Sequence, residues 1–372
     1  MNTNMNSLEE DVLTSNGTNP VEAPGLELNS AKGGESNLSA ASTAFANRGE
    51  NFADVVRLAA PLILSDSFRR LRRITFLGIL SPAYSNVDYH PIKFTTTRSD
   101  RSRNHHSLRV ALLAGKMSEC LGFSPETTRY AVAWGLLHDI ATWPLSHTGE
   151  VAFSDATQTS AQTLRRMMIV GDGRLHRSLH AYYAVKEMKL DVDLLLGLFD
   201  RKADLDGEAS DLHKLLHSVL TPDTLEGMHR SGCTFDLDVP RPIEFIDAME
   251  RDLVSGLRLK RTHSALAIRF WRMKSRIYSC YINKEETVAF ESSWSAAIRD
   301  HYRNIDLSES LHANESDILR NVASRYLRPV NEVVRYKAPL IYQVSLRYRH
   351  AKKLKDSIPV DALSKVFTKD RA

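Results

Sequence analysis

"GLLHDIATWPLSHTGE", residues 135–150, joins an apolar run to a His-Asp pair, a Trp-Pro break and another histidine. The preceding residues, "SPETTRYAVAW", begin with Ser124, a favoured N-cap, and Pro125, a favoured first helical residue. We therefore expect a buried helix with His138 and Asp139 in its last turn. Burying a histidine and a carboxylate without partners is costly, and a metal ion shared by the two would satisfy both.

Similar helical patterns continue along most of the chain. From Phe52 onward, apolar residues recur at spacings of three and four, while alternating strand patterns closed by tight turns are nearly absent. The sequence predicts an all-α fold. Residues 1–49 are rich in Asn, Ser, Gly and Ala and predict a disordered tail. We expect a helical core over residues 50–260 and a helical C-terminal extension over residues 261–372.

Composition excludes several classes of protein. The 372 residues are 42% hydrophobic and 25% charged, as in an ordinary globular protein. The three cysteines have no C-x-x-C spacing, which argues against a disulfide framework or a thiolate zinc site and favours a reducing, cytoplasmic setting. No apolar run approaches the ~20 residues of a membrane span. The net charge of +4 does not by itself indicate a nucleic-acid-binding protein.

Two further segments place candidate ligands on helices of their own. "RSRNHHSLRVALLAGKMSECLGF" (101–123) reads as an amphipathic helix with two histidines at its start. "RPIEFIDAMERDLVSG" (241–256) places Asp247 inside an apolar stretch that also looks helical. The order is therefore His, His-Asp and Asp on three helices.

This order resembles the HD-domain metal-dependent phosphohydrolases, which are named for such a ligand set. The resemblance implies that one divalent ion is held by His106, His138, Asp139 and Asp247. Imidazole and carboxylate ligands together suit Mn²⁺, Fe²⁺, Zn²⁺ or Ni²⁺, and Mg²⁺ stays open as well.

A closer resemblance is to the deoxynucleoside triphosphate triphosphohydrolases, which include bacterial dGTPases and the SAM-and-HD-domain dNTPases. It rests on "FRRLRRITFLGIL" (68–80), on an Arg-x-x-His-Ser-Leu element at 103–108 and on "HDIATWPLSHTGE" (138–150), and it spans roughly residues 50–260. It implies that Arg103 contacts substrate phosphate, and that His147 and His176 act with Asp139 in catalysis. Ester hydrolysis needs a proton donor for the leaving oxygen, and we expect His147 to supply it.

The sequence departs from this family at one catalytic position and leaves two assignments with alternatives. Ala141 and Thr142 stand where the family carries Gly-His after the His-Asp pair. His180 is an alternative to His176. Glu244 and Asp252 flank Asp247, which we prefer because "IDAM" fits the family pattern best.

Two functions from different classes follow. The first is a hydrolase of nucleotides or other phosphate esters, most specifically one that converts a dNTP and water to a deoxynucleoside and triphosphate; an HD phosphodiesterase or nucleotidase is a variant of this reading. The second is a regulatory HD protein whose basic C-terminal part binds nucleic acid, a nucleotide or a partner. Basic residues interleaved with Tyr and Trp beyond residue 261 are compatible with nucleic acid, a solvated helix face or a homo-oligomer contact.

Overall fold

The computed structural model describes residues 59–88, 90–94, 100–217, 220–252 and 256–323, which all belong to one compact unit assigned to residues 58–372. The expected tail over residues 1–49 lies outside the described residues. The basic segments over residues 333–372 lie outside them too.

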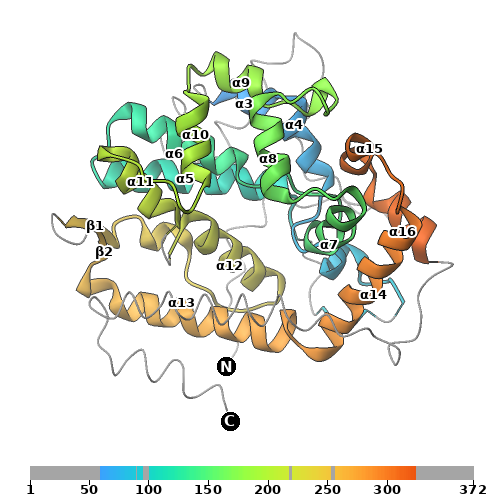
Figure 1. The fold of residues 1–372 in the computed structure, drawn as a ribbon. Coiled ribbons are helices and arrows are strands. Elements are labelled where there is room, and N and C mark those ends of the chain that lie inside the picture. Colours follow the sequence, from blue (N-terminus) through green and yellow to red (C-terminus); the bar gives the residue numbers. More distant parts are fainter. Residues whose placement is uncertain (1–58, 89, 95–99, 218–219, 253–255, 324–372) are drawn as a thin grey trace, which may run out of the picture. The chain divides into compact units, whose positions relative to one another are not determined.

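Helices make up nearly all of the regular structure in the described part of the chain, so the all-α prediction is confirmed (Figure 1). The first helices are α3 (Ala60–Leu64), α4 (Asp66–Arg69), η2 (Arg70–Arg73), η3 (Gly78–Leu80), η4 (Pro82–Tyr84), α5 (Arg103–Cys120), α6 (Pro125–Leu137), α7 (Ser146–Thr157) and α8 (Ala161–Val170). The next are η5 (Arg177–Leu179), α9 (Tyr182–Glu187), α10 (Val192–Phe199), α11 (Gly207–His217), α12 (Pro222–Thr234) and η6 (Pro242–Phe245). Strands β1 (Met249–Asp252) and β2 (Gly256–Leu259) form an antiparallel pair. The last elements are η7 (Arg261–His263), α13 (Ser264–Ile277), the π-helical turn η8 (Tyr278–Ile282), α14 (Glu285–His301), α15 (Leu307–His312) and α16 (Glu315–Ala323).

Helices α5 and α6 pack closely against each other, and α12 packs on α5. The N-cap of α5 is Ser102 and that of α6 is Ser124, and each side chain accepts a hydrogen bond from a backbone N–H in the first turn. Gly135 allows the close crossing, because a Cβ there would lie 2.7 Å from the backbone nitrogen of Ala111 and closer still to its Cα. The predicted helix ends slightly earlier than expected, at Leu137 with His138 as its C-cap, so Asp139 lies just beyond its last turn.

The turn that leads into α7 has an unusual backbone. Leu145 and Ser146 have φ values of 62° and 51°, in the left-handed region that costs a non-glycine residue energy. The backbone N–H of Leu145 donates to the Glu315 carboxylate at 2.6 Å, and Ser146 Oγ accepts from Arg103 Nε at 2.9 Å. A Cβ at Gly149 would collide with the Pro144 carbonyl oxygen. Contacts from distant parts of the chain therefore hold this turn.

The helices beyond residue 260 pack on the earlier ones. Helix α13 contacts α12, and α14 contacts α7 and η3. Residues 261–323 thus share one compact unit with the helices before them. None of the helices that the structure describes is long and apolar enough to cross a membrane.

Candidate metal centre

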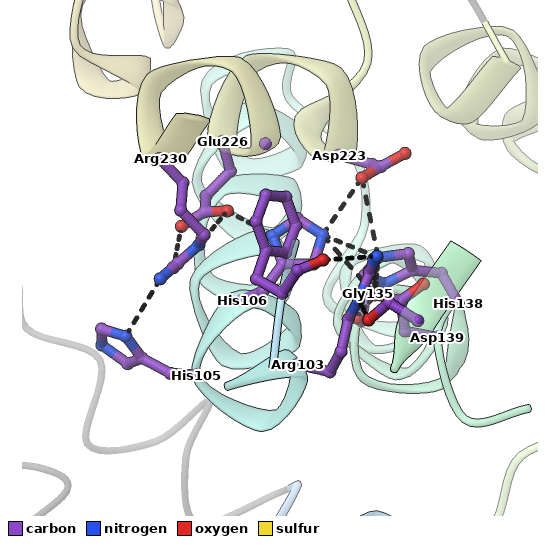
Figure 2. Close-up of polar contacts among 12 residues, drawn as sticks. Arg103, His105, His106, Gly135, His138, Asp139, Asp223, Glu226 and Arg230 are labelled. Carbon is purple, nitrogen blue, oxygen red and sulfur yellow. Dashed lines mark hydrogen bonds and ion pairs between the residues drawn. The ribbon is translucent and has the colours of Figure 1, made fainter. Parts of the chain in front are cut away.

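Three helices bring histidines and carboxylates together. His106 lies in the first turn of α5, His138 and Asp139 follow α6, and Asp223 lies in the first turn of α12, whose N-cap is Thr221. Figure 2 shows His106 between Glu226 on one side and the His138, Asp139 and Asp223 side chains on the other.

The facing atoms have the spacing of ligands around one ion. His106 Nε2 lies 3.2 Å from His138 Nε2 and 3.2 Å from Asp223 Oδ1, and His138 Nε2 lies 3.7 Å from Asp223 Oδ1. Asp139 Oδ2 lies 3.5 Å from His138 Nε2 and 3.7 Å from His106 Nε2. Ligands bonded to a single ion at about 2.1 Å, at tetrahedral or octahedral angles, are about 3.0 to 3.4 Å apart. His106, His138 and Asp223 come close to this spacing and could hold a divalent cation, and Asp139 lies beside the two histidines.

Proton placement shows why a cation suits this group. His138 Nδ1 lies 2.7 Å from the Gly135 carbonyl oxygen, which can only accept, so Nδ1 carries the proton and Nε2 offers a lone pair. His106 Nδ1 faces Glu226 in the same way, which leaves its Nε2 toward the group. Lone pairs of two imidazoles and two carboxylates therefore converge. A proton on His106 Nε2 supplies one positive charge among them, whereas a divalent ion would supply two and would be held by His106, His138 and Asp223, with Asp139 beside them.

Glu226 and Arg230 orient His106 from behind. Glu226 accepts the His106 Nδ1 proton with one carboxylate oxygen and pairs with Arg230 through the other. Both side chains are buried on α12. A carboxylate that accepts the outer N–H of a metal-binding histidine fixes its tautomer and increases its basicity.

Arg103 fixes Asp139. Its Nη1 donates to Asp139 Oδ2 at 2.9 Å, its Nε to Ser146 Oγ at 2.9 Å and its Nη2 to the Phe76 carbonyl at 2.8 Å. The side chain is buried and also lies over the Phe76 ring. Each of its nitrogens thus donates to the protein, which makes Arg103 a positioning residue for Asp139. The phosphate contact expected from the sequence stays a prediction.

The pKa values follow from burial and from the mixture of charges. Burial alone would raise the pKa of Asp139, but the charges of His138, Arg103 and His106 outweigh it and hold that pKa far below its usual range. The pKa of Asp223 is lowered to about 2, because interaction with His106 and His138 outweighs burial. Burial lowers the pKa of His138. Burial also acts to lower the pKa of His106, but Glu226, Asp223 and Asp139 raise it to about 9. The carboxylates are therefore ionised and ready to bind a cation.

Asp247 does not join this group, which corrects the ligand set expected from the sequence. It lies between η6 and β1 rather than inside a helix, its side chain is 68% exposed, and it pairs with His263 at 3.9 Å. Asp223 occupies the ligand position that the sequence had led us to expect for Asp247. The alternative Glu244 accepts from the backbone N–H of Arg241 at the start of η6.

The two other predicted catalytic histidines lie outside the group. His147 is in the first turn of α7, 77% exposed, with Nδ1 3.5 Å from Glu150 Oε2. His176 is exposed and caps η5, where its Nδ1 accepts from the backbone N–H of Ser178. Its ring faces His312, so the structure does not place His176 with the metal-binding residues. The alternative, His180, is not in the group either, because its Nε2 lies 3.0 Å from the backbone carbonyl oxygen of Asp172.

Asp223 and Glu226 are the residues that sequence reasoning missed. An acidic residue in the first turn after a Thr-Pro start is common in helices, so Asp223 carried no special signal. The overlooked pattern was the spacing of Asp223, Glu226 and Arg230 at i, i+3 and i+7, which places three charged residues on one face of a largely buried helix.

Comparisons with known proteins cover part of this group. The family model of the HD domain matches residues 103–205, which include His106, His138 and Asp139 and end before Asp223. A comparison with curated proteins finds no match. A hypothetical protein from Aquifex aeolicus has a similar structure, with 17% identity and a TM-score of 0.52 over 82% of this chain and 79% of that one. A phosphohydrolase from Bacteroides thetaiotaomicron gives 17% identity and a TM-score of 0.49, and the match covers 71% of this chain. This chain thus spans 65% of the length of that protein. At such identities the likeness to the Aquifex protein concerns the fold.

Proposed function

We propose that this protein is a metal-dependent phosphohydrolase of the HD type. The observation that carries the proposal is the convergence of His106, His138 and Asp223, whose ligand atoms all lie within 4.8 Å of one another, with Asp139 beside the two histidines. A match to the HD-domain family model over the segment that holds three of these residues supports it. Imidazole and carboxylate together are a suitable ligand set for a borderline divalent ion.

The residues around the group have separable tasks. A bound divalent ion supplies Lewis-acid chemistry for phosphoryl transfer. Arg103 holds the Asp139 carboxylate in place, and Glu226 holds the ring of His106. His147 is the proposed proton donor to the leaving oxygen. Its partner Glu150 has a pKa that burial acts to raise but His147 and Arg103 lower, which puts the His147–Glu150 pair within electrostatic reach of the site.

For the substrate we propose a nucleotide, with a dNTP as the specific candidate. In the reaction, water adds to the α-phosphorus, the bond from phosphorus to the 5′-oxygen breaks, and a proton reaches that oxygen, so that deoxynucleoside and triphosphate leave. The resemblance of residues 68–80 and 103–108 to dNTP triphosphohydrolases supports this choice. Thr142, in place of the usual histidine, makes His147 the main candidate for the proton.

The test is hydrolysis by the Mn²⁺-loaded protein of a panel of dNTPs, NTPs, nucleoside monophosphates and a phosphodiester, with nucleoside and phosphate products separated by chromatography. We expect release of triphosphate from at least one dNTP, and loss of this activity in Asp223→Asn. Release of inorganic phosphate from monophosphates alone would replace the dNTP assignment while keeping the phosphohydrolase. A metal-loaded protein that cleaves no phosphate ester would contradict the enzyme and leave the regulatory alternative.

A further inference from the structure

A second arginine, on a different helix from Arg103, interacts electrostatically with the carboxylates of the candidate metal centre. Arg165 is on α8, and its guanidinium carbon lies 4.9 Å from the centre of the Phe199 ring. That ring stacks on Trp134 at 5.7 Å, and Trp134 stacks on His138 at 5.6 Å. A continuous series of stacked groups thus joins Arg165 to a proposed metal ligand.

The charged groups that act on Arg165 are those of the site. Burial lowers its pKa, while the carboxylates of Asp139, Glu150 and Asp223 raise it. Asp139 and Asp223 are proposed ligands, and Glu150 pairs with His147. A positive charge that acts on these carboxylates would also attract an anion bound at the metal ion that they hold.

One donor of Arg165, its Nε, has no partner within the described ranges. That nitrogen is buried, and in the described part of the chain none of the three carboxylates forms an ion pair with Arg165. Arg103 differs, because each of its nitrogens donates to the protein. Leaving a buried N–H donor unpaired is costly, so a ligand that accepted from Nε would remove this cost.

We propose that Arg165 binds a phosphate group of the substrate, the role that the sequence had suggested for Arg103. This inference rests on the proposed function, since it assumes a phosphate compound at the metal centre. A guanidinium offers two parallel N–H donors that match two phosphate oxygens, and the Phe199 ring packs against it. The ligand class is a phosphate or polyphosphate anion.

The test is calorimetric binding of inorganic pyrophosphate to the Mn²⁺-loaded protein, which needs no turnover. We expect Arg165→Gln to keep its metal and to weaken pyrophosphate binding by on the order of 10- to 100-fold, the effect of losing charge-assisted hydrogen bonds. Arg166→Gln is the matched control, because Arg166 is the next residue on α8 and is exposed. Arg165→Lys keeps the charge and loses the fork, so its affinity should lie between those of wild type and Arg165→Gln, and it replaces that variant if Arg165→Gln does not fold.

The outcomes separate this inference from the proposed function. Pyrophosphate affinity within twofold of wild type in metal-loaded Arg165→Gln would overturn the role of Arg165 while leaving the hydrolase intact. Wild type that binds no pyrophosphate would overturn it as well. Arg165-dependent binding in a protein that hydrolyses no phosphate ester would support the binding site and contradict the enzyme.

Discussion

Arg103 and Arg165 illustrate how burial and partners decide what a charged residue does. Both interact electrostatically with the same carboxylate, Asp139, but Arg103 also donates to Asp139, Ser146 and Phe76. Local spacing could indicate that Arg103 belongs to the site, but not that three protein groups hold it there, since Phe76 and Ser146 lie 27 and 43 residues away.

Arg103→Lys should therefore act on the metal-binding residues before it acts on substrate. Lysine can keep one contact to Asp139 but cannot reach Ser146 and the Phe76 carbonyl at the same time. We expect metal affinity to fall by about 10- to 100-fold, as for other residues that hold a ligand. Competition with a chelator measures this, and Arg73→Lys, at an exposed position on η2, is the control. A normal metal affinity with a raised KM would support the phosphate role instead.

The crossing of α5 and α6 positions the central ligands at the scale of elements. His106 and His138 come from these two helices, and Gly135 lets the helices approach while its carbonyl accepts from His138 Nδ1. The sequence was sufficient to predict α6 and its end, since the caps and the apolar run are local. It was not sufficient to predict α12 as the source of Asp223, because that depends on which helix packs against α5.

Gly135→Ala should separate these two helices. The added Cβ has no room beside the Ala111 backbone, and overpacking of this kind costs roughly 1 to 3 kcal/mol. We expect a lower free energy of unfolding in urea, together with weaker metal binding because His106 and His138 move apart. Gly173→Ala is the control, since nothing lies within 4 Å of a Cβ there. Unchanged stability in Gly135→Ala would show that the crossing tolerates a methyl group.

In the molecule as a whole, residues far beyond the His-Asp pair hold the segment that follows it. Arg70 donates to the carbonyls of Ile140 and Thr142, and Trp143 Nε1 donates to Ser310 Oγ at 3.1 Å. Glu315, at the start of α16, accepts from the backbone N–H groups of Leu145 and Thr75. Helical patterns predicted the C-terminal helices as a class, but not that they would contact this turn, because such contacts leave no local signal.

Glu315 should make the stability depend on pH. Burial raises its pKa to about 7, although hydrogen bonds from Tyr84, Leu145 and Thr75 oppose the rise. The folded state therefore holds this proton more tightly than the unfolded state, and the stability it contributes is lost as pH rises from about 4.5 through about 7. Glu315→Gln keeps a neutral side chain, so its stability relative to wild type should increase over this window, by on the order of 3 kcal/mol.

Urea unfolding at pH 5 and pH 8 measures this difference. Glu309→Gln, at an exposed position on α15, is the control and should show the same pH dependence as wild type. A difference between Glu315→Gln and wild type that stays constant with pH would mean that Glu315 does not keep its proton in the folded protein.

The metal content of Asp223→Asn and Asp247→Asn tests the central claim most directly. Each protein is loaded with Mn²⁺, passed over a desalting column and measured by elemental analysis beside wild type. We expect one ion per chain in wild type and in Asp247→Asn, whose side chain is exposed and bound to His263, and little or none in Asp223→Asn, because a neutral amide is a poor ligand. Retention of the ion in Asp223→Asn together with its loss in Asp247→Asn would contradict this account and restore the ligand set expected from the sequence.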